Sequence, residues 1–371
     1  MENTEIWKLA RNILLVRLDS LGDVLMSVPA IRAVRQTLPL ATITLLTSSE
    51  GSAVTPLIPQ IDKTITFDAP WVKNPSGFSA STREFNSVAS KLRRQFFDAA
   101  IIFTVYSQNP LPAALLCFLA NIPLRLGYCH ENPYQLLNYW VPDPEPQVFI
   151  RHEVERQLAL VKQVGLTTDN QKLAITVPEE AVASVKEKLS NKGVSPKSFW
   201  ILLHPGASDI VRRYDPQKYI EAAKTLSKIT QATIVVTGKE DEKDLVDSIA
   251  AGVGKNAVSF SGKLNLDELV SLISLSPLVI TNNTGPAHIA AATNTPLVCV
   301  YGHTNPQHTP WMAQSRVLPF DVPCKACIRG ICPIGTHPKP REVSPDEIVH
   351  ASLELLNQTG KGISSWRLLT S

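Results

Sequence analysis

The sequence has no long hydrophobic run and no leader pattern. None of its apolar stretches reaches the roughly 18–20 residues that a membrane-spanning helix needs. Residues 1–11 mix Glu, Lys and Arg, without a signal peptide's apolar centre and small-residue cleavage site. We therefore expect a cytoplasmic protein that does not span the membrane.

Strong net charge is also missing. The formal charge is +3 over 371 residues, so no field of one sign favours nucleic acid, and the basic cluster Lys91, Arg93 and Arg94 fits a solvated helix face. With 44% hydrophobic and 19% charged residues, the chain has enough apolar material to fold throughout. Its length favours two domains over one closed barrel.

Two phosphate-binding patterns are absent. The dinucleotide fingerprint Gly-x-Gly-x-x-Gly does not occur, and the stretch Gly252–Lys255 fails the P-loop pattern because Ile249 and Asn256 occupy two of its required positions. Neither nicotinamide chemistry nor ATP hydrolysis is indicated, and no organic cofactor is expected.

Cysteine is scarce, and half of it is scattered. Three of the six cysteines lie in apolar or mixed segments, where a reduced, buried thiol is expected: Cys117, Cys129 and Cys299. The others form a run in which a fourth ligand could follow: Cys324, Cys327, Cys332 and His337. A complete metal site usually has four ligands with cleaner spacing, so we expect reduced thiols and no metal here.

Strand and helix patterns alternate along the first half of the chain. An apolar run at 13–18 is followed by Gly22 and Asp23 and then by apolar residues at helical spacing, which predicts a strand, a tight turn and a helix. Further strands are predicted at 42–46, 63–67, 99–103 and 125–128, with helices at 82–95 and 110–120.

The alternation restarts after a helix at 153–164 and a polar segment. Strands are predicted at 200–204, 233–237, 257–260, 278–281 and 297–301, with helices at 216–226, 241–250, 266–274 and 285–292 and a last helix from Pro345. This indicates α/β domains with mainly parallel sheets, at 1–175 and 176–345, and a helical tail at 346–371. We expect the ligand site in a cleft between the carboxyl ends of the two sheets.

Three loops carry the candidate site residues. Thr284, Gly285 and His288 open a helix after a buried strand, and helix N-termini bind phosphate. The alternative is a well-capped turn, with His288 as a satisfied interior histidine. A second loop, 204–208, ends at Ser208 and is followed by Arg212 and Arg213, which suit a diphosphate unless they are merely solvated.

The third loop follows the first strand and includes Asp19, Ser20, Gly22 and Asp23. Gly22 is expected to allow a tight turn, which would place Asp23 near a helix N-terminus and facing the cleft. Asp23 is then either a general base or only an N-cap.

The run of residues 13–32, ILLVRLDSLGDVLMSVPAIR, resembles the opening of the heptosyltransferases, glycosyltransferase family 9. Four more stretches match in order: 204–208, 236–238 with acidic residues after it, 281–292, and the cysteine run with 344–347. The resemblance implies a GT-B fold of two Rossmann-like domains and inverting, metal-independent transfer. It implies an ADP-heptose-like donor and a lipid-linked oligosaccharide acceptor of the lipopolysaccharide core, reached by peripheral contact with the inner face of the membrane.

The resemblance also assigns roles. Asp23 matches the catalytic aspartate, with Ser20 and Gly22 on the acceptor-side loop. The donor-binding positions that it implies are Ser208, Arg212 at the diphosphate, Glu242 at the ribose, Leu264 at the adenine, and Asn283, Thr284, Gly285 and His288 at the phosphate-binding turn.

Three positions depart from the family pattern. Asn283 stands where Asp is common and cannot carry its charge, Arg212 replaces the usual Lys, and Lys339 replaces a frequent Cys. Three alternatives stay open on the residues: a nucleotide-sugar epimerase of the same fold, which needs no acceptor; a non-catalytic nucleotide-sugar-binding protein, which Asn283 would suit; and a metal-binding redox module built on the cysteine run.

Overall fold

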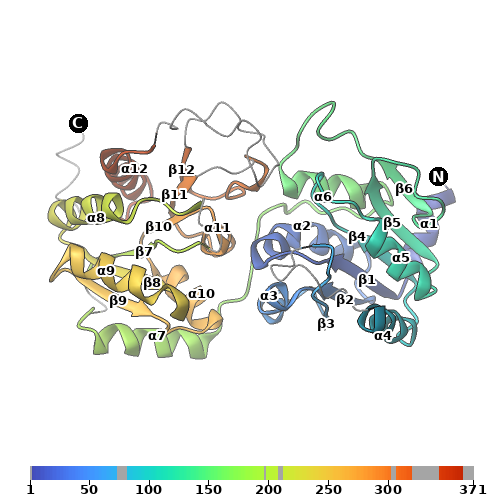
Figure 1. Ribbon diagram of the computed structural model, residues 1–371, viewed down its shortest axis with the longest axis horizontal. Coiled ribbons are helices and arrows are strands. Elements are labelled where there is room, and N and C mark those ends of the chain that lie inside the picture. The colour runs from blue at the N-terminus through green and yellow to red at the C-terminus, as the bar shows by residue number, and fades with distance from the viewer. Residues whose placement is uncertain are drawn as a thin grey trace. The chain divides into compact units, whose positions relative to one another are not determined.

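The computed structural model divides the chain into two compact units, residues 1–173 and 174–371 (Figure 1). The residues that it describes are 2–72, 82–195, 198–207, 212–301, 306–319 and 342–361. The sequence-based boundary after residue 175 falls close to the division between the units, and the last helix belongs to the second unit.

In the first unit, strands and helices alternate. The described strands are β1 (Asn12–Arg17), β2 (Thr42–Thr47), β3 (Lys63–Thr66), β4 (Ala99–Ile102), β5 (Leu124–Cys129) and β6 (Tyr139–Pro142). The described helices are α1 (Glu2–Lys8), α2 (Leu21–Thr37), α3 (Ser49–Ser52), α4 (Thr82–Arg93), α5 (Leu111–Leu119) and α6 (Glu153–Lys162).

The strands of this unit form one parallel sheet in the order β3-β2-β1-β4-β5-β6. Successive side chains of a strand point to opposite faces. Leu14 and Val16 of β1 therefore share a core with α4 and α5, whereas Arg17 lies on the other face, where it meets residues of α2 and α6. A charged residue is thus placed beneath the first turn of α2.

The second unit repeats the alternation. Its described strands are β7 (Trp200–His204), β8 (Thr233–Gly238), β9 (Ala257–Ser261), β10 (Val279–Asn282), β11 (Leu297–Tyr301) and β12 (Ser315–Pro319). Its described helices are α7 (Glu179–Asn191), α8 (Pro216–Thr230), α9 (Lys243–Val253), α10 (Leu266–Leu275), α11 (Gly285–Ala292) and α12 (Pro345–Gln358).

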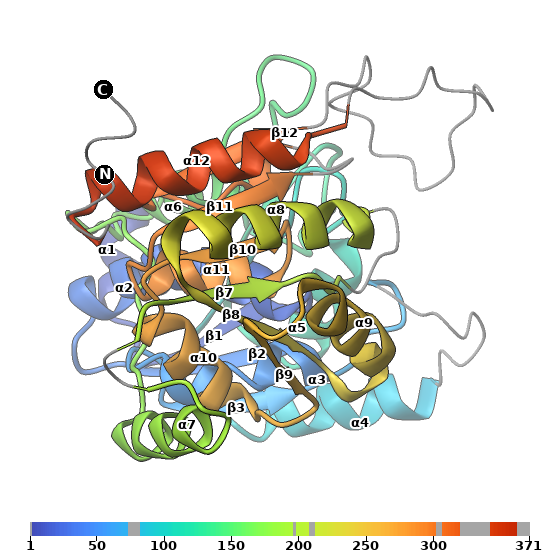
Figure 2. The same ribbon diagram turned by 90° about the vertical axis from the view of Figure 1, so that its left-hand side faces the viewer.

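This sheet is also parallel, in the order β12-β11-β10-β7-β8-β9. Ile201 and Leu203 of β7 pack into a core with residues of α8, α9 and α12, and α8 packs between the other two helices (Figure 2). Of the remaining helices, α10 contacts both α7 and α11. Helices on both faces bury both sides of the strands, which explains why these strands read as continuous apolar runs.

Parallel pairing has one consequence for the site. The carboxyl ends of all strands in a sheet lie at one edge, so the loops after β1, β4 and β6 gather at the edge of the first sheet. Those after β7, β8, β9 and β10 gather at the edge of the second. Open α/β sheets bind ligands at such edges.

The predicted α/β class is confirmed, and most predicted strands and helices are found within a residue or two of their expected bounds. Five of these helices and strands were missed: α1, α3, β6, α7 and β12. No helix was predicted before residue 12, where α1 forms, and α7 forms after the predicted helix 153–164, where only a polar segment was expected.

Candidate active site

Asp23 is the third residue of α2. Ser20 is the N-cap in an extended conformation, and the chain changes direction there, so the suggestion that Asp23 could itself be the N-cap is wrong. The Ser20 backbone N–H donates to Asp23 Oδ2 at 3.1 Å and the Ser20 hydroxyl donates to the same oxygen at 2.6 Å. Two donors from one residue therefore fix the carboxylate.

Gly22 does not make the tight turn that the sequence suggested. It is the second residue of α2, buried and helical, and the helix begins one residue before it. The expectation was wrong because the turn between strand and helix is completed by Asp19 and Ser20.

Arg17 lies beneath Asp23 and is fully buried. Its Nη2 donates to Asp23 Oδ1 at 3.1 Å, its Nη1 donates to Glu153 Oε1 at 2.8 Å, and its Nε lies 3.1 Å from Asp19 Oδ2. Burial would lower the pKa of the guanidinium, but Asp19, Glu153 and Asp23 raise it above its ordinary value. Arg17 is therefore a permanent cation shared by carboxylates from three segments.

Asp19 is held in place by residues from two other loops. Gln108, from the loop after β4, donates through Nε2 to Asp19 Oδ1, and the Ser48 hydroxyl donates to the Asp19 carbonyl at 2.6 Å. Burial raises the pKa of the Asp19 carboxyl, and Arg17 counteracts part of that rise. The Asp19 carboxyl therefore has a pKa above that of an ordinary aspartate.

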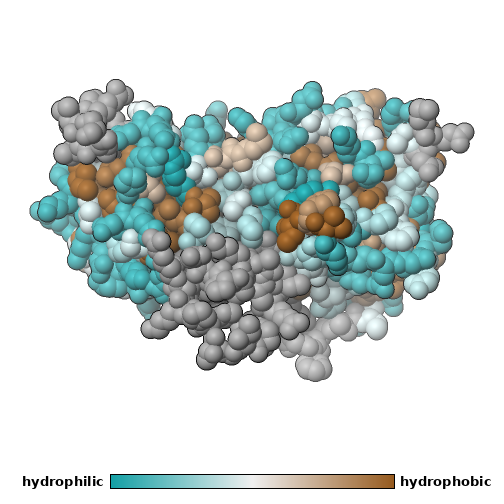
Figure 3. Space-filling view, turned by 90° about the horizontal axis from the view of Figure 1, so that it is seen from above, coloured by the Kyte–Doolittle hydropathy of each residue, from teal (hydrophilic) through white to brown (hydrophobic). Residues whose placement is uncertain are grey.

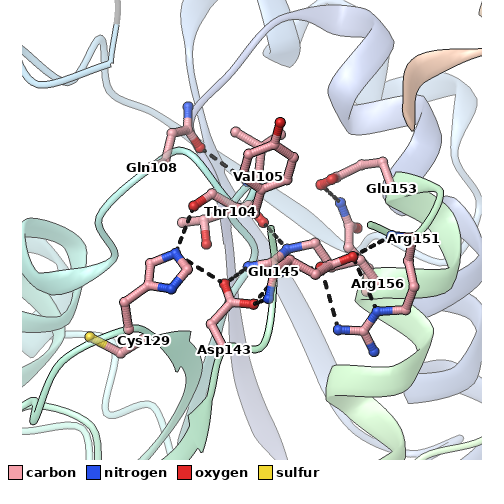
Figure 4. A network of polar contacts seen from close by, with 12 residues as sticks. Thr104, Val105, Gln108, Cys129, Asp143, Glu145, Arg151, Glu153 and Arg156 are labelled. Carbon is pink, nitrogen blue, oxygen red and sulfur yellow. Dashed lines mark hydrogen bonds and ion pairs between the residues drawn. The ribbon is translucent and has the colours of Figure 1, made fainter. Parts of the chain in front are cut away.

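A second buried ionic network fixes the loop between β6 and α6 (Figure 4). Arg156 of α6 pairs with Asp143 at 2.6 Å and with Glu145, and its Nε donates to the Thr104 carbonyl at 2.9 Å. Its guanidinium also lies 4.5 Å from the ring centroid of Tyr128. These contacts hold the start of α6, and with it Glu153, against the carboxyl ends of β4 and β5.

The tip of the same loop is apolar and exposed. Val148, Phe149 and Ile150 are 74%, 46% and 40% exposed. The loop rises as a green arch between β6 and α6 in Figure 1, and Figure 3, which looks down on that side, shows brown hydrophobic surface among hydrophilic residues. The first sheet's edge thus carries both the Asp23 cluster and an apolar surface.

In the second unit, the predicted donor-binding residues lie at the carboxyl edge of the sheet. Glu242 follows β8, Leu264 follows β9, and Asn283 to His288 follow β10. Arg212 lies between β7 and α8. Ser208 lies outside the described residues.

Glu242 occupies a space that two glycines leave open. A Cβ at Gly206 would lie 2.2 Å from Glu242 Oε1, and a Cβ at Gly238 would lie 3.1 Å from its Oε2. The Lys239 backbone N–H donates to Oε2 at 3.0 Å. The carboxylate is therefore 7% exposed and held rigidly between the loops after β7 and β8.

Two arginines follow the β7 loop and differ in their contacts. Arg213 donates through Nε to the Ala207 carbonyl at 2.8 Å and lies 3.9 Å from Glu242 Oε1. The Nε of Arg212 is buried and has no hydrogen-bond partner among the residues that the structure describes. A buried cationic donor without a partner suits an anion that binds there.

The turn after β10 leads directly into α11. Thr284 is the N-cap, half-buried and extended, and its side chain does not cap the helix. Gly285 and Pro286 begin the helix, while Asn283 and His288 are buried at 3% and 5% exposure. The start of α11 is thus small and partly open, which suits a phosphate.

Sequence reasoning assigned no role to several residues that organise these edges. Arg17 is the last residue of the apolar strand NILLVR, and Glu153 is the first residue of α6. An arginine at the end of a buried strand indicates a buried acidic partner, and that was the signal available in the sequence. Asn282 bonds to the carbonyl of Pro205 at 2.6 Å and accepts from the Tyr214 N–H and the Tyr219 hydroxyl at 3.2 and 2.8 Å. It ties β10 to the loop after β7.

Within the described part of the chain, no group of three or more potential ligand side chains could hold a metal ion. The metal candidates Cys324, Cys327, Cys332 and His337, together with Lys339, lie outside that part. No helix in these described residues is both long and apolar enough to cross a membrane.

Comparison with known proteins identifies the family. Residues 85–337 match the model of glycosyltransferase family 9 (heptosyltransferase). The chain is 26% identical over 361 residues to lipopolysaccharide heptosyltransferase 2 of Salmonella typhimurium, covering 94% of this chain and 99% of the relative. Identity to the enzyme of the same name from Escherichia coli K12 is 26% over 359 residues, covering 93% and 99%.

Solved structures share the fold. The glycosyl transferase family 9 protein from Veillonella parvula superimposes with a TM-score of 0.78 at 21% identity, covering 94% of this chain and 98% of the other. E. coli ADP-heptose lps heptosyltransferase II gives 0.72 at 24% identity, covering 94% and 99%. Because the family model covers more than half of the chain and both sheets are of the Rossmann type, this protein belongs to glycosyltransferase family 9, the heptosyltransferase family, and has the GT-B fold.

Proposed function

We propose that this glycosyltransferase moves a heptose-like sugar from an ADP-sugar to a hydroxyl of a lipopolysaccharide-core acceptor, with inversion and without a metal. The proposal is supported most by the Asp23 carboxylate, which Ser20 and Arg17 hold at the carboxyl end of β1. The donor is favoured by the named relatives, lipopolysaccharide heptosyltransferases and an ADP-heptose heptosyltransferase.

Asp23 is the general base in this proposal. Its carboxylate takes the proton of the acceptor hydroxyl while that oxygen forms a bond to the anomeric carbon of the donor sugar. The bond between the anomeric carbon and the diphosphate breaks on the opposite side, so the configuration inverts. One proton moves to Asp23 and one electron pair leaves with ADP, which balances the step.

The second unit binds the nucleotide in this proposal. Arg212, with its unpartnered Nε, and the start of α11 at Thr284 and Gly285 take the negative charge that grows on the leaving diphosphate. Glu242 accepts from the ribose hydroxyls and Leu264 contacts the base. Ser208, Asn283 and His288 complete the donor site.

The acceptor places the enzyme at a membrane surface. A lipid-linked core oligosaccharide would bring the protein to the inner face of the cytoplasmic membrane by peripheral contact. The exposed Val148, Phe149 and Ile150 at the first sheet's edge provide apolar surface for that contact.

The test is transfer from ADP-heptose to a heptose-deficient lipopolysaccharide core, followed by heptose incorporation and ADP release. Asp23→Asn should lower turnover by about 10²–10⁴-fold, because the amide cannot accept the proton. ADP affinity, measured by calorimetry, should stay within about twofold, since the variant leaves the second unit unchanged.

Asp68→Asn is the matched control. Asp68 also follows a strand and accepts from the Ser49 N–H at 2.7 Å at the start of a helix, so it tests the loss of a capping carboxylate alone. Its turnover should equal that of the wild type. Unchanged turnover in Asp23→Asn would remove Asp23 from the role of base, and isomerised donor without acceptor would point to an epimerase.

A further inference from the structure

One buried guanidinium in the first unit faces three carboxylates. Arg17 is fully buried and contacts Asp19, Asp23 and Glu153 at 3.1, 3.1 and 2.8 Å. When all are ionised, this cluster carries two negative charges more than positive ones. Burying an excess of like charge is costly, and a structural ion pair would need only one carboxylate.

Glu153 is the least expected member. It is fully buried at the start of α6, and its Oε1 accepts from Arg17 Nη1 at 2.8 Å and from Gln157 Nε2 at 2.7 Å. Its Oε2 is buried and has no hydrogen-bond partner within the described part of the chain. A residue retained only for stability would have both oxygens satisfied.

The charged groups around the cluster come from several elements. Arg17 comes from β1, Asp19 from the turn after it, and Asp23 from α2. Glu153 and Arg156 both come from α6, and their charges interact. Arg156 forms its ion pairs with Asp143 and Glu145, which follow β6. The carboxylate charge of Glu153 is therefore directed mainly at Arg17.

We propose that Glu153 is a positioning residue that holds Arg17 and shares its charge, so that Asp23 stays fixed but remains a good proton acceptor. This inference rests on the proposed function, in which Asp23 is the base. A guanidinium paired with Asp23 alone would stabilise its carboxylate and weaken it as a base. Glu153, which contacts Arg17 Nη1, and Asp19, which contacts Arg17 Nε, partly neutralise the guanidinium charge that acts on Asp23. The planar guanidinium meanwhile keeps its fixed donor geometry.

The test is the pH dependence of kcat/KM for Glu153→Gln. A glutamine can keep Oε1 and both hydrogen bonds and replaces only the unpartnered oxygen, so the variant is expected to fold. Without the negative charge of Glu153, the positive charge of Arg17 stabilises the Asp23 carboxylate more strongly. The acid limb should therefore move to lower pH by about one unit and the plateau should fall about tenfold.

Two variants control for structure. Glu153→Asp keeps the charge, and its acid limb should return to the wild-type position. Glu268→Gln removes a buried carboxylate of the second unit that pairs with Lys188 instead of Arg17, so the acid limb of this variant should stay at the wild-type position. If the role of Glu153 is merely structural, Glu153→Gln should shift the midpoint of urea unfolding but leave the acid limb of the kcat/KM profile in place.

The outcomes separate the two proposals. If Asp23→Asn abolishes turnover and Glu153→Gln leaves the acid limb in place, the inference on Glu153 is overturned and the base survives. If Asp23→Asn retains turnover, the proposed function fails first. Should Glu153→Gln not fold, Asp19→Asn must move the limb in the same direction, and an unmoved limb there would also overturn the inference.

Discussion

His204 is a buried histidine at the end of β7, with its Nδ1 3.1 Å from the Thr237 hydroxyl. Burial lowers its pKa to about 4, whereas an unfolded histidine titrates near about 6.5. The unfolded chain therefore binds the extra proton first as pH falls. His204 should contribute stability that is complete above about pH 6.5 and is lost progressively toward about pH 4, up to about 3 kcal/mol.

Urea unfolding at pH 7 and pH 5 measures this contribution. His204→Gln should lose less stability between the two pH values than the wild type does. The control is His350→Gln, which makes the same substitution at a histidine that is exposed on α12. An equal pH difference in the wild type and His204→Gln would contradict the prediction.

The sequence indicated Asp23 but not its surroundings. A carboxylate next to a glycine shortly after an apolar strand is a readable pattern, and the family motif covers the same residues. That Arg17 and Glu153 meet there depends on contacts between residues 136 positions apart. Such contacts are set by which helix covers which face of the sheet, and a local pattern does not contain that information.

Asn282 joins elements that are distant in sequence. Its side chain is fully buried and links the end of β10 to Pro205 after β7 and to Tyr214 and Tyr219 around the start of α8. Asn282→Ala would leave a buried carbonyl, N–H and hydroxyl without these bonds. The free energy of unfolding should fall by about 3 kcal/mol, measured by urea denaturation.

Tyr219→Phe is the graded comparison for this element-scale prediction. It removes only the hydroxyl that donates to Asn282 Oδ1 and keeps the ring in the core, so it should cost about 1 kcal/mol. If both variants lose the same free energy of unfolding, Asn282 stabilises the protein only through its hydrogen bond with the Tyr219 hydroxyl and not by joining the loops.

The missed helix α7 and the missed strands β6 and β12 have two different causes. The helix α7 has its buried residues Ala181, Val185 and Leu189 at helical spacing, so the signal was present in the sequence and was overlooked among polar neighbours. Strands β6 and β12 lie at the edges of their sheets, and neither shows a continuous buried run. Their strand conformation is set by pairing with a single neighbour, which tertiary structure supplies.

At the scale of the whole molecule, the two units should respond differently to nucleotide. Amide hydrogen exchange with saturating ADP should slow most in residues 204–207, 238–242 and 282–288, because a ligand suppresses the local opening of the segments that it binds. The segments 17–23 and 102–108 of the first unit should change less.

AMP provides the control for that experiment. It lacks the outer phosphate, so protection at residues 284–288 should be smaller with AMP than with ADP if the start of α11 binds the diphosphate. The largest ADP-dependent protection within residues 1–173 would contradict the assignment of the nucleotide to the second unit.

The sequence by itself determined the type and order of most elements, because apolar periodicity and glycine, proline and capping residues act over a few positions. It also carried the motifs by which the family is recognised. Only the tertiary structure decided the strand orders β3-β2-β1-β4-β5-β6 and β12-β11-β10-β7-β8-β9, and the meeting of Arg17 with three carboxylates. The reason is physical: strand order and shared charge arise from packing between segments far apart in the chain, and such packing leaves no local pattern.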